Sequence, residues 1–272
     1  MAENLPLGLQ DFRKIIENDF LYVDKTAYLY NMVSRPGAYF LSRPRRFGKS
    51  LTVSTLNELY KGSRELFKGL WIEDKWDWSR KHPVIRLSFK DINFEQRGLE
   101  EPLSERITEI GSNHQIQLVA KSARDRMREL IIALSGPRKV VVLIDEYDAP
   151  ILHYLGVNVE KSVENREFLK EFYSVLKEMD AHLELVFLTG VSKFSKTGIF
   201  SGLNNLTDLT MDAGFATMLG YTQDELTSCF SEKIAEAADS LELSRDELLE
   251  GMRIWYNGYR FHYRAEKVYN PL

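Results

Sequence analysis

Four short apolar runs divide the chain, and polar or charged residues follow each of them. The runs lie at 38–41, 84–89, 140–144 and 183–188. Continuous apolar runs such as 140–144 are typical of strands buried on both faces of a parallel sheet, whereas the segment 84–89 alternates and should be the second strand. A weaker pattern at 208–211 predicts a fifth strand.

Between these runs, apolar residues recur at the spacing of amphipathic helices. Helices are expected at 12–17, 25–33, 52–70, 99–134, 165–179, 222–240 and 244–256. Ser244 followed by Glu247 is the pattern of a capping box at the start of the last helix. The order predicts an α/β fold with a doubly wound, mostly parallel sheet and helices on both faces. We assign residues 1–212 to this core with an N-terminal helical extension, and residues 213–272 to a C-terminal helical lid.

The junction between the first apolar run and the next helix reads SRPRRFGKSLT at 42–52. Its Gly48-Lys49-Ser50 is the closing half of a phosphate-binding P-loop, which needs a strand–loop–helix context. The first N–H groups of a helix lack helical partners and lie at its positive dipole end, so a loop around them binds anions. A P-loop NTPase would place Lys49 on the β- and γ-phosphates of ATP and Ser50 on Mg²⁺. The phosphate-binding residues would be Arg45, Arg46, Phe47, Gly48, Lys49, Ser50 and Leu51.

This loop departs from the general pattern G-x-x-x-x-G-K-[ST]. Arg43 stands where the first glycine usually makes the sharp turn easy, and Pro44 stiffens the chain. Arg45 and Arg46 either add positive charge near the phosphates or face solvent. A G-K-S tripeptide also occurs at strand–helix junctions by chance, so the motif needs support from a second one.

The third apolar run supplies that support, because it ends in acids. Asp145 follows the run at the carboxyl end of the predicted strand, where open α/β sheets bind ligands. This is the Walker B position, whose Asp holds Mg²⁺, and Glu146 would polarise the attacking water as a general base. The alternative is a strand capped by solvated carboxylates. Two motifs in the right order favour the nucleotide-binding interpretation.

The run at 183–188 ends in a set of candidate sensor residues. In P-loop ATPases with an extra strand between the P-loop and Walker B strands, that strand ends in a polar group that contacts the γ-phosphate or the attacking water. Thr189, Ser192 and Lys193 are the candidates here. An ordinary exit from a strand into a loop remains the alternative for each of them.

Six phrases along the chain resemble one family. They are YVDKT at 22–26, SRPRRFGKS at 42–50, LIDEYD at 143–148, TGVSKFS at 189–195, IFSGLNNL at 199–206 and WYNGY at 255–259. They are similar to the bacterial AAA-ATPase-like family, predicted P-loop ATPases often fused to a C-terminal PD-(D/E)XK nuclease-like domain. In that family the RPRRFGKS loop is the usual form, so Arg43 departs from the general Walker A pattern only. The resemblance implies ATP and Mg²⁺ as ligands.

The chain stops at Leu272, about where the family's ATPase region meets the nuclease-like domain. It is either a fragment of a longer protein or a protein that consists of the ATPase region. We expect no nuclease-like domain in residues 1–272, and no nuclease activity is carried over from the resemblance.

Composition changes this picture little. Hydrophobic residues make up 44% of the chain and charged residues 28%, which is ordinary globular usage. The net charge of −4 gives no electrostatic reason to expect nucleic-acid binding. The lone cysteine, Cys229, suits a reducing compartment, and neither a membrane-spanning run nor a signal-peptide pattern is evident, so we expect a cytoplasmic protein.

Three functional hypotheses follow. The first is an Mg²⁺-dependent ATPase in which Lys49 binds phosphate, Ser50 and Asp145 hold the metal, Glu146 activates water, and Lys193 or Ser192 senses the γ-phosphate. The second is a nucleotide-gated switch or scaffold with little turnover that acts on a protein partner or effector domain. The third is an ATPase module that controls a nuclease. Arg253 and Arg260 are candidates for a lid arginine directed at the nucleotide.

Overall fold

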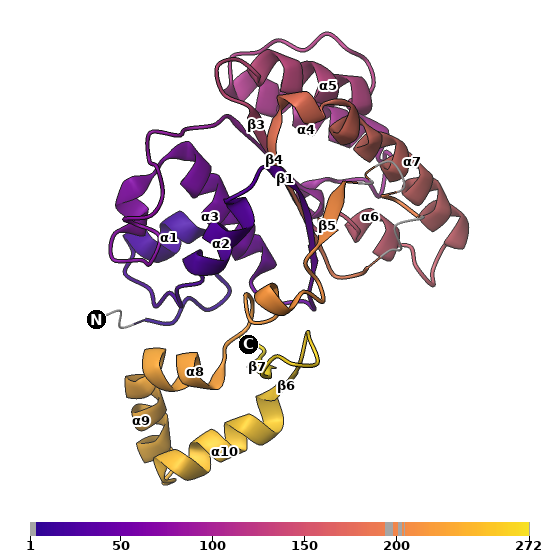
Figure 1. Cartoon of the computed structure of the whole chain (residues 1–272). Helices are drawn as coiled ribbons and strands as arrows, with labels where there is room; N and C mark the ends of the chain where they lie inside the picture. The colour runs from indigo at the N-terminus through magenta and orange to yellow at the C-terminus, as the bar shows by residue number, and fades with distance from the viewer. Residues whose placement is uncertain (1–3, 194–197, 201–202, 204, 272) are drawn as a thin grey trace.

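A parallel sheet forms the centre of the computed structural model, which describes residues 4–193, 198–200, 203 and 205–271 (Figure 1). Within the described residues it has five strands in the order β2-β3-β4-β1-β5. Their bounds are β1 Gly37–Ser42, β2 Val84–Ser88, β3 Val140–Asp145, β4 Leu183–Gly190 and β5 Leu206–Asp208. All four neighbouring pairs are parallel. The expected strand β4 lies between the P-loop strand β1 and the acid-bearing strand β3, and both β3 and β4 are buried throughout.

Helices cover both faces of this sheet (Figure 1). One face carries α1 Phe12–Glu17, α2 Thr26–Val33 and α3 Lys49–Lys61; the other carries α4 Glu100–Asn113, α5 Ala123–Leu134, α6 Ala149–Leu152 and α7 Val159–Glu178. Alternate residues of β3 pack on opposite faces of the sheet. Val142 and Ile144 contact the face covered by α4 to α7, and Val141 and Leu143 contact the face covered by α1 to α3. The predicted doubly wound α/β fold is confirmed, and the sheet is buried on both sides, as its unbroken apolar runs require.

Two of the predicted helices differ from the observed ones: one ends early and the other is divided in two. The helix expected at 52–70 stops at Lys61, because Gly62 adopts φ +77° and its N–H bonds back to Leu59. A left-handed glycine is a common helix terminator. A short 3₁₀ turn, Arg64–Phe67, follows. The helical stretch expected at 99–134 is two helices, and the side chain of Ser122 caps the second.

The C-terminal part forms a small lobe beside the sheet (Figure 1). It contains α8 Gln223–Cys229, α9 Ser231–Ser240 and α10 Arg245–Tyr256, followed by an antiparallel hairpin of β6 Asn257–Tyr259 and β7 Val268–Tyr269. The single helix expected at 222–240 is broken at Phe230 into α8 and α9. The capping box of Ser244 and Glu247 is confirmed. The division of the chain at residue 212 stays a prediction.

Two local assignments at strands differ from the sequence patterns. The fifth strand pairs with β1 at Leu206–Asp208 and overlaps the expected segment 208–211 only at Asp208, where Leu209 N–H donates to the Phe40 carbonyl at the end of the pairing. Asn257 and Gly258 lie inside β6, although Asn-Gly dipeptides are usual in turns. Among the described helices, none combines the length and the apolar character needed to cross a bilayer.

Candidate functional site

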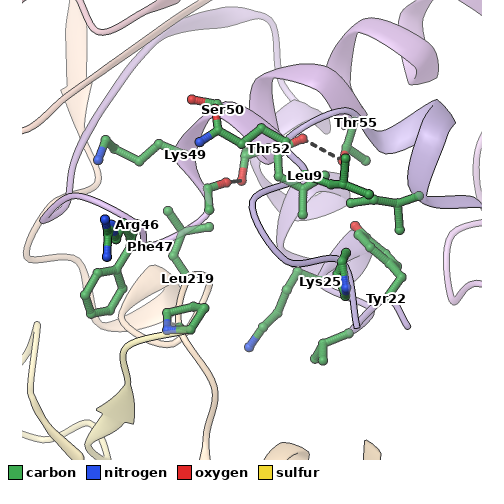
Figure 2. Close-up of a pocket in the computed structure, with 18 of the residues that line it drawn as sticks. Leu9, Tyr22, Lys25, Arg46, Phe47, Lys49, Ser50, Thr52, Thr55 and Leu219 are labelled. Carbon is green, nitrogen blue, oxygen red and sulfur yellow. Dashed lines mark hydrogen bonds between the residues drawn. The ribbon is translucent and has the colours of Figure 1, made fainter. Parts of the chain in front are cut away.

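A cavity of about 610 Å³ opens where the loop after β1 meets the N-terminal segment and the lid. Its walls include residues 5–10, 21–23, 45–52 and 218–221, with Lys25, Lys90 and Glu146. Figure 2 shows Arg46, Lys49 and Ser50 on one side of this space, with Leu9, Tyr22 and Lys25 across from them. A concave site of this size accommodates a small-molecule ligand.

The loop between β1 and α3 has the backbone of an anion-binding turn. Arg46 adopts φ +70° and Gly48 adopts φ +88°, and α3 begins at the next residue, Lys49. Glycine adopts this left-handed geometry at no steric cost, whereas an arginine is strained there. Left-handed residues just before a helix turn successive N–H groups toward one side, which forms a concave set of donors. Thr52 stabilises the first turn through both its N–H and its hydroxyl, which donate to the Gly48 carbonyl at 3.0 and 3.1 Å.

Lys49 is buried in this loop. Its Nζ donates to the carbonyl oxygens of Arg43 and Pro44, both at 2.9 Å. Burial lowers the pKa of Lys49, while the negative charges of Asp145 and other nearby acids act in the opposite direction. The ammonium is thus held close to the loop by backbone carbonyls.

The other predicted loop residues also reach the cavity. Arg45 and Arg46 are exposed, so they both face solvent and line the site. Phe47 is buried, and Ser50 and Leu51 are half-buried in the first turn of α3. All seven residues from 45 to 51 therefore contribute to one wall.

The carboxyl ends of β3 and β4 bring Asp145 and Thr189 to the same edge of the sheet. Ile144 pairs with Leu188, so Asp145 and Thr189 are neighbours. The Thr189 hydroxyl donates to Asp145 Oδ1 at 2.5 Å, and Glu146 N–H donates to the same oxygen at 3.1 Å. Asp145 is buried, with 4% of its surface exposed. Thr189, a sensor candidate from the sequence, therefore orients the carboxylate of Asp145.

Glu146 leaves β3 in a strained conformation and faces the cavity. Its φ of +52° is in the left-handed region, which is uncommon for a residue with a side chain and often marks a functional position. Burial raises the pKa of Glu146, and the neighbouring Asp145 charge raises it further, while Lys90 and Lys49 partly oppose these effects. The carboxyl group combines an elevated pKa with access to the cavity, which is typical of a general base.

Tyr147 and Asp148 form hydrogen bonds to the backbone of the residues that follow β4. Asp148 Oδ2 accepts from the N–H groups of Val191 at 3.0 Å and Ser192 at 2.6 Å, and the Tyr147 hydroxyl donates to the Ser192 carbonyl at 2.9 Å. Burial raises the pKa of Asp148. Sequence reasoning assigned no role to Asp148, although its position as the last acid of LIDEYD was a signal.

The structure places all three sensor candidates, Thr189, Ser192 and Lys193, outside the cavity wall, and Asp145 is not among the lining residues either. Ser192 is fixed through its backbone, and Lys193 pairs with Asp208 of β5 at 2.7 Å. Arg253 pairs with Glu250, and Arg260 is exposed just after β6. Neither arginine is among the residues that line the site. Phe194 and Ser195 of the TGVSKFS phrase, and Ser201, Gly202 and Asn204 of IFSGLNNL, lie outside the described residues.

Lys25 is a residue of the site that motif reasoning left without a role. Its Nζ donates to the Thr217 carbonyl at 2.9 Å and to both carboxylate oxygens of Glu225 at 2.5 and 2.6 Å. Glu225 also accepts from Thr222 N–H in the capping box of α8. Lys25 thus joins the start of α2 to α8 of the C-terminal lobe. The YVDKT phrase was the only feature of the sequence that pointed to Lys25, since its partner Glu225 lies 200 positions further along the chain.

Gly190, the last residue of β4, is required by close packing. A Cβ atom there would lie 2.3 Å from Tyr147 Cε1 and 2.7 Å from Asp148 Oδ1. We expect Gly190→Ala to lower the free energy of unfolding by about 3 kcal/mol, because overpacked sites relax at such a cost. Gly251→Ala, in α10 with no atom within 4 Å of the added Cβ, is the matched control and should stabilise by about 0.5–1 kcal/mol. Equal urea midpoints for the two variants would contradict the packing described here.

These features together define an α/β protein of the P-loop NTPase class: a parallel sheet, a phosphate-type loop after β1 and acids after β3. The family model described as "Predicted AAA-ATPase" matches residues 6–200. The chain belongs to this AAA-ATPase-like family.

The comparison with curated proteins finds a relative that matches nearly the whole of this chain. A protein of Azotobacter chroococcum mcd 1, described as "Uncharacterized protein in vnfD 5'region", is 43% identical over 273 residues. The match covers 99% of this chain and 50% of that relative. The chain therefore spans about half the length of the curated relative it matches.

Proposed function

We propose that this protein binds ATP together with Mg²⁺ in the cavity and hydrolyses it to drive or gate a partner. One observation carries the proposal: the loop residues 45–48 and Lys49 at the start of α3 line one wall, and Glu146, just after β3, lines the same cavity. Cationic and N–H donors would bind the phosphates, and a carboxylate beside them would act on water.

The wall away from the P-loop suits a nucleobase. It combines apolar side chains from the N-terminal segment, such as Leu9, with Met218 and Leu219 from the stretch before the lid. Apolar surface with a few backbone polar groups is the usual lining of a small-molecule site. We propose that the base lies between these two segments, with the phosphates directed toward Lys49.

The residues at the strand ends fit a magnesium ion. Both hydrogen bonds to Asp145 go to Oδ1, which leaves Oδ2 for another ligand, and Ser50 supplies a hydroxyl in the first turn of α3. Carboxylate and hydroxyl oxygens are the hard ligands that Mg²⁺ prefers. When bound, Mg²⁺ supplies positive charge that neutralises the β- and γ-phosphate oxygens. Ser50 and Asp145 would hold it.

The protein's own residues would then perform two tasks. Lys49 would exchange the carbonyls of Arg43 and Pro44 for phosphate oxygens, because a phosphate is the stronger acceptor for an ammonium group. Glu146, in its ionised form, would accept a proton from the water that attacks the γ-phosphate. Thr189 would keep the Asp145 carboxylate oriented through the bond to Oδ1.

The test is ATP binding by calorimetry beside steady-state phosphate release, with Mg²⁺ and with EDTA. We expect one ATP per chain and release of phosphate that EDTA abolishes. Failure to bind ATP at millimolar concentration would overturn the proposal.

The pH dependence of turnover follows from the environment of Glu146. Only the ionised carboxylate can accept a proton, and the pKa of Glu146 is raised, so turnover should fall on the acid side at a higher pH than an ordinary glutamate would give. Lys90→Met removes a charge that lowers this pKa, so the acid limb should move to still higher pH. The measurement is kcat between about pH 5 and pH 9. An identical acid limb in wild type and Lys90→Met would count against Glu146 as the titrating base.

A switch with little turnover is the second candidate, and the bonds of Lys49 favour it. Phosphate binding must first displace two backbone carbonyls from a buried ammonium group. Tight ATP binding without phosphate release in the experiment above would select this candidate.

A further inference from the structure

Two side chains of the P-loop are held by the C-terminal hairpin. Phe47 is 1% exposed, and its ring centroid lies 4.8 Å from that of Tyr259 and 5.5 Å from that of Phe261, both edge-on. Edge-to-face aromatic pairs at such distances are favourable beyond their burial. The residue before Gly48 is therefore anchored by a segment more than 200 positions away in the chain.

Arg43 makes the second connection. Its Nη1 donates to the carbonyls of Ser42 and Thr210, and its Nη2 donates to that of Phe215 at 3.1 Å. The guanidinium carbon lies 3.9 Å from the centroid of the Phe261 ring, within cation–π range. The side chain is buried and turned toward the lid, while its carbonyl accepts from Lys49. This position holds glycine in the general Walker A pattern.

Arg43 stays positively charged at neutral pH although its side chain is buried. Desolvation lowers the pKa of Arg43 to about 10, which leaves the guanidinium protonated at neutral pH. A buried cation needs compensation from dipoles or charges. Three carbonyls and the Phe261 ring supply it here.

The hairpin itself is fixed against the core. Tyr221 and Tyr269 exchange backbone hydrogen bonds at 3.2 and 2.8 Å, and Val268 is fully buried in the same cluster as Phe47. Gly220 permits this approach: a Cβ there would lie 2.8 Å from the Tyr269 carbonyl and 3.1 Å from Phe47 Cε1. Motion of the hairpin and motion of the P-loop are thus mechanically linked.

We propose that the C-terminal hairpin is part of the phosphate site, with Phe261 and Tyr259 as positioning residues that fix the P-loop through Arg43 and Phe47. In P-loops of the general Walker A pattern, a turn at the first glycine fixes the shape of the loop. In this protein, where Arg43 takes that position, the packing of the hairpin fixes it instead. Occupation of the loop by phosphate changes the hairpin, and displacement of the hairpin weakens phosphate binding. The effect on nucleotide affinity rests on the function proposed above, whereas the restraint on the loop does not.

The first test measures amide hydrogen exchange of residues 45–50 in the protein without nucleotide. Phe261→Leu removes the ring and keeps an apolar side chain, so exchange of these amides should rise by about 10-fold, because the loop opens locally more often. Phe261→Tyr keeps the ring, so residues of the loop in this variant should exchange their amide hydrogens at the wild-type rate. Tyr263→Ala is the matched control, since that ring is 72% exposed and only two positions away. Unchanged exchange in folded Phe261→Leu, as judged by its melting curve, would overturn the inference.

The second test compares ATP with adenosine. Phe261→Leu should weaken ATP binding about 10-fold and leave adenosine binding unchanged, because the loop contacts only the phosphates. Equal weakening of both ligands would indicate general loss of structure and would contradict a positioning role. If wild-type protein bound no ATP while exchange still rose in Phe261→Leu, the proposed function would fail and the structural restraint would stand.

Discussion

Glu146→Gln is expected to bind ATP as tightly as the wild type and to hydrolyse it at least about 100-fold more slowly, since general base catalysis contributes 10²–10⁴-fold. The substitution keeps the size and polarity of the side chain and removes its ability to take a proton. Glu146 lines the cavity but forms none of the bonds that hold the P-loop, so binding should survive.

The control for this variant is Glu160→Gln, an exposed acid in the first turn of α7. Both variants should be measured by calorimetry for ATP and by phosphate release under saturating ATP and Mg²⁺. Wild-type turnover in Glu146→Gln would remove the general-base role and leave Glu146 as a strained structural residue.

Lys49→Met should weaken ATP binding by about 100-fold, because the loss of a charge-assisted hydrogen bond costs about 2–3 kcal/mol. Turnover at cellular ATP concentrations should fall with it. Methionine keeps most of the buried apolar stem, so the fold is retained better than with alanine.

Lys61→Met tests whether any lysine of α3 would show this effect. Lys61 is exposed at the opposite end of the helix from Lys49, so its replacement should leave ATP affinity unchanged. Equal ATP affinity in Lys49→Met and wild type would mean that Lys49 serves only the loop carbonyls of Arg43 and Pro44.

The two variants together separate the candidate functions. The ATP affinities of Glu146→Gln and Lys49→Met should differ, because we assign phosphate binding to Lys49 and activation of water to Glu146. A protein that works as a switch would lose function in Lys49→Met and keep it in Glu146→Gln. An ATPase that drives its partner by turnover would lose function in both.

Much of the site could be predicted because its chemistry is local in sequence. The P-loop lies between one strand and one helix, so Arg45 to Leu51 were identifiable from seven consecutive residues. Asp145 and Glu146 directly follow a strand whose unbroken apolar character marks it as buried. Lys193 shows the limit: its pairing with Asp208 depends on β5 lying beside β1, which no local pattern specifies.

The sequence by itself determined the class of fold, the P-loop and the acids, because helical spacing, buried runs and short motifs are properties of neighbouring residues. Only the tertiary structure decided that Thr189 donates to Asp145, and that 5–10 and 218–221 form a wall opposite Lys49. It also decided that Arg43 turns toward Phe261. These contacts join residues far apart in the chain, and their energies come from burial and desolvation that exist only once the layers pack.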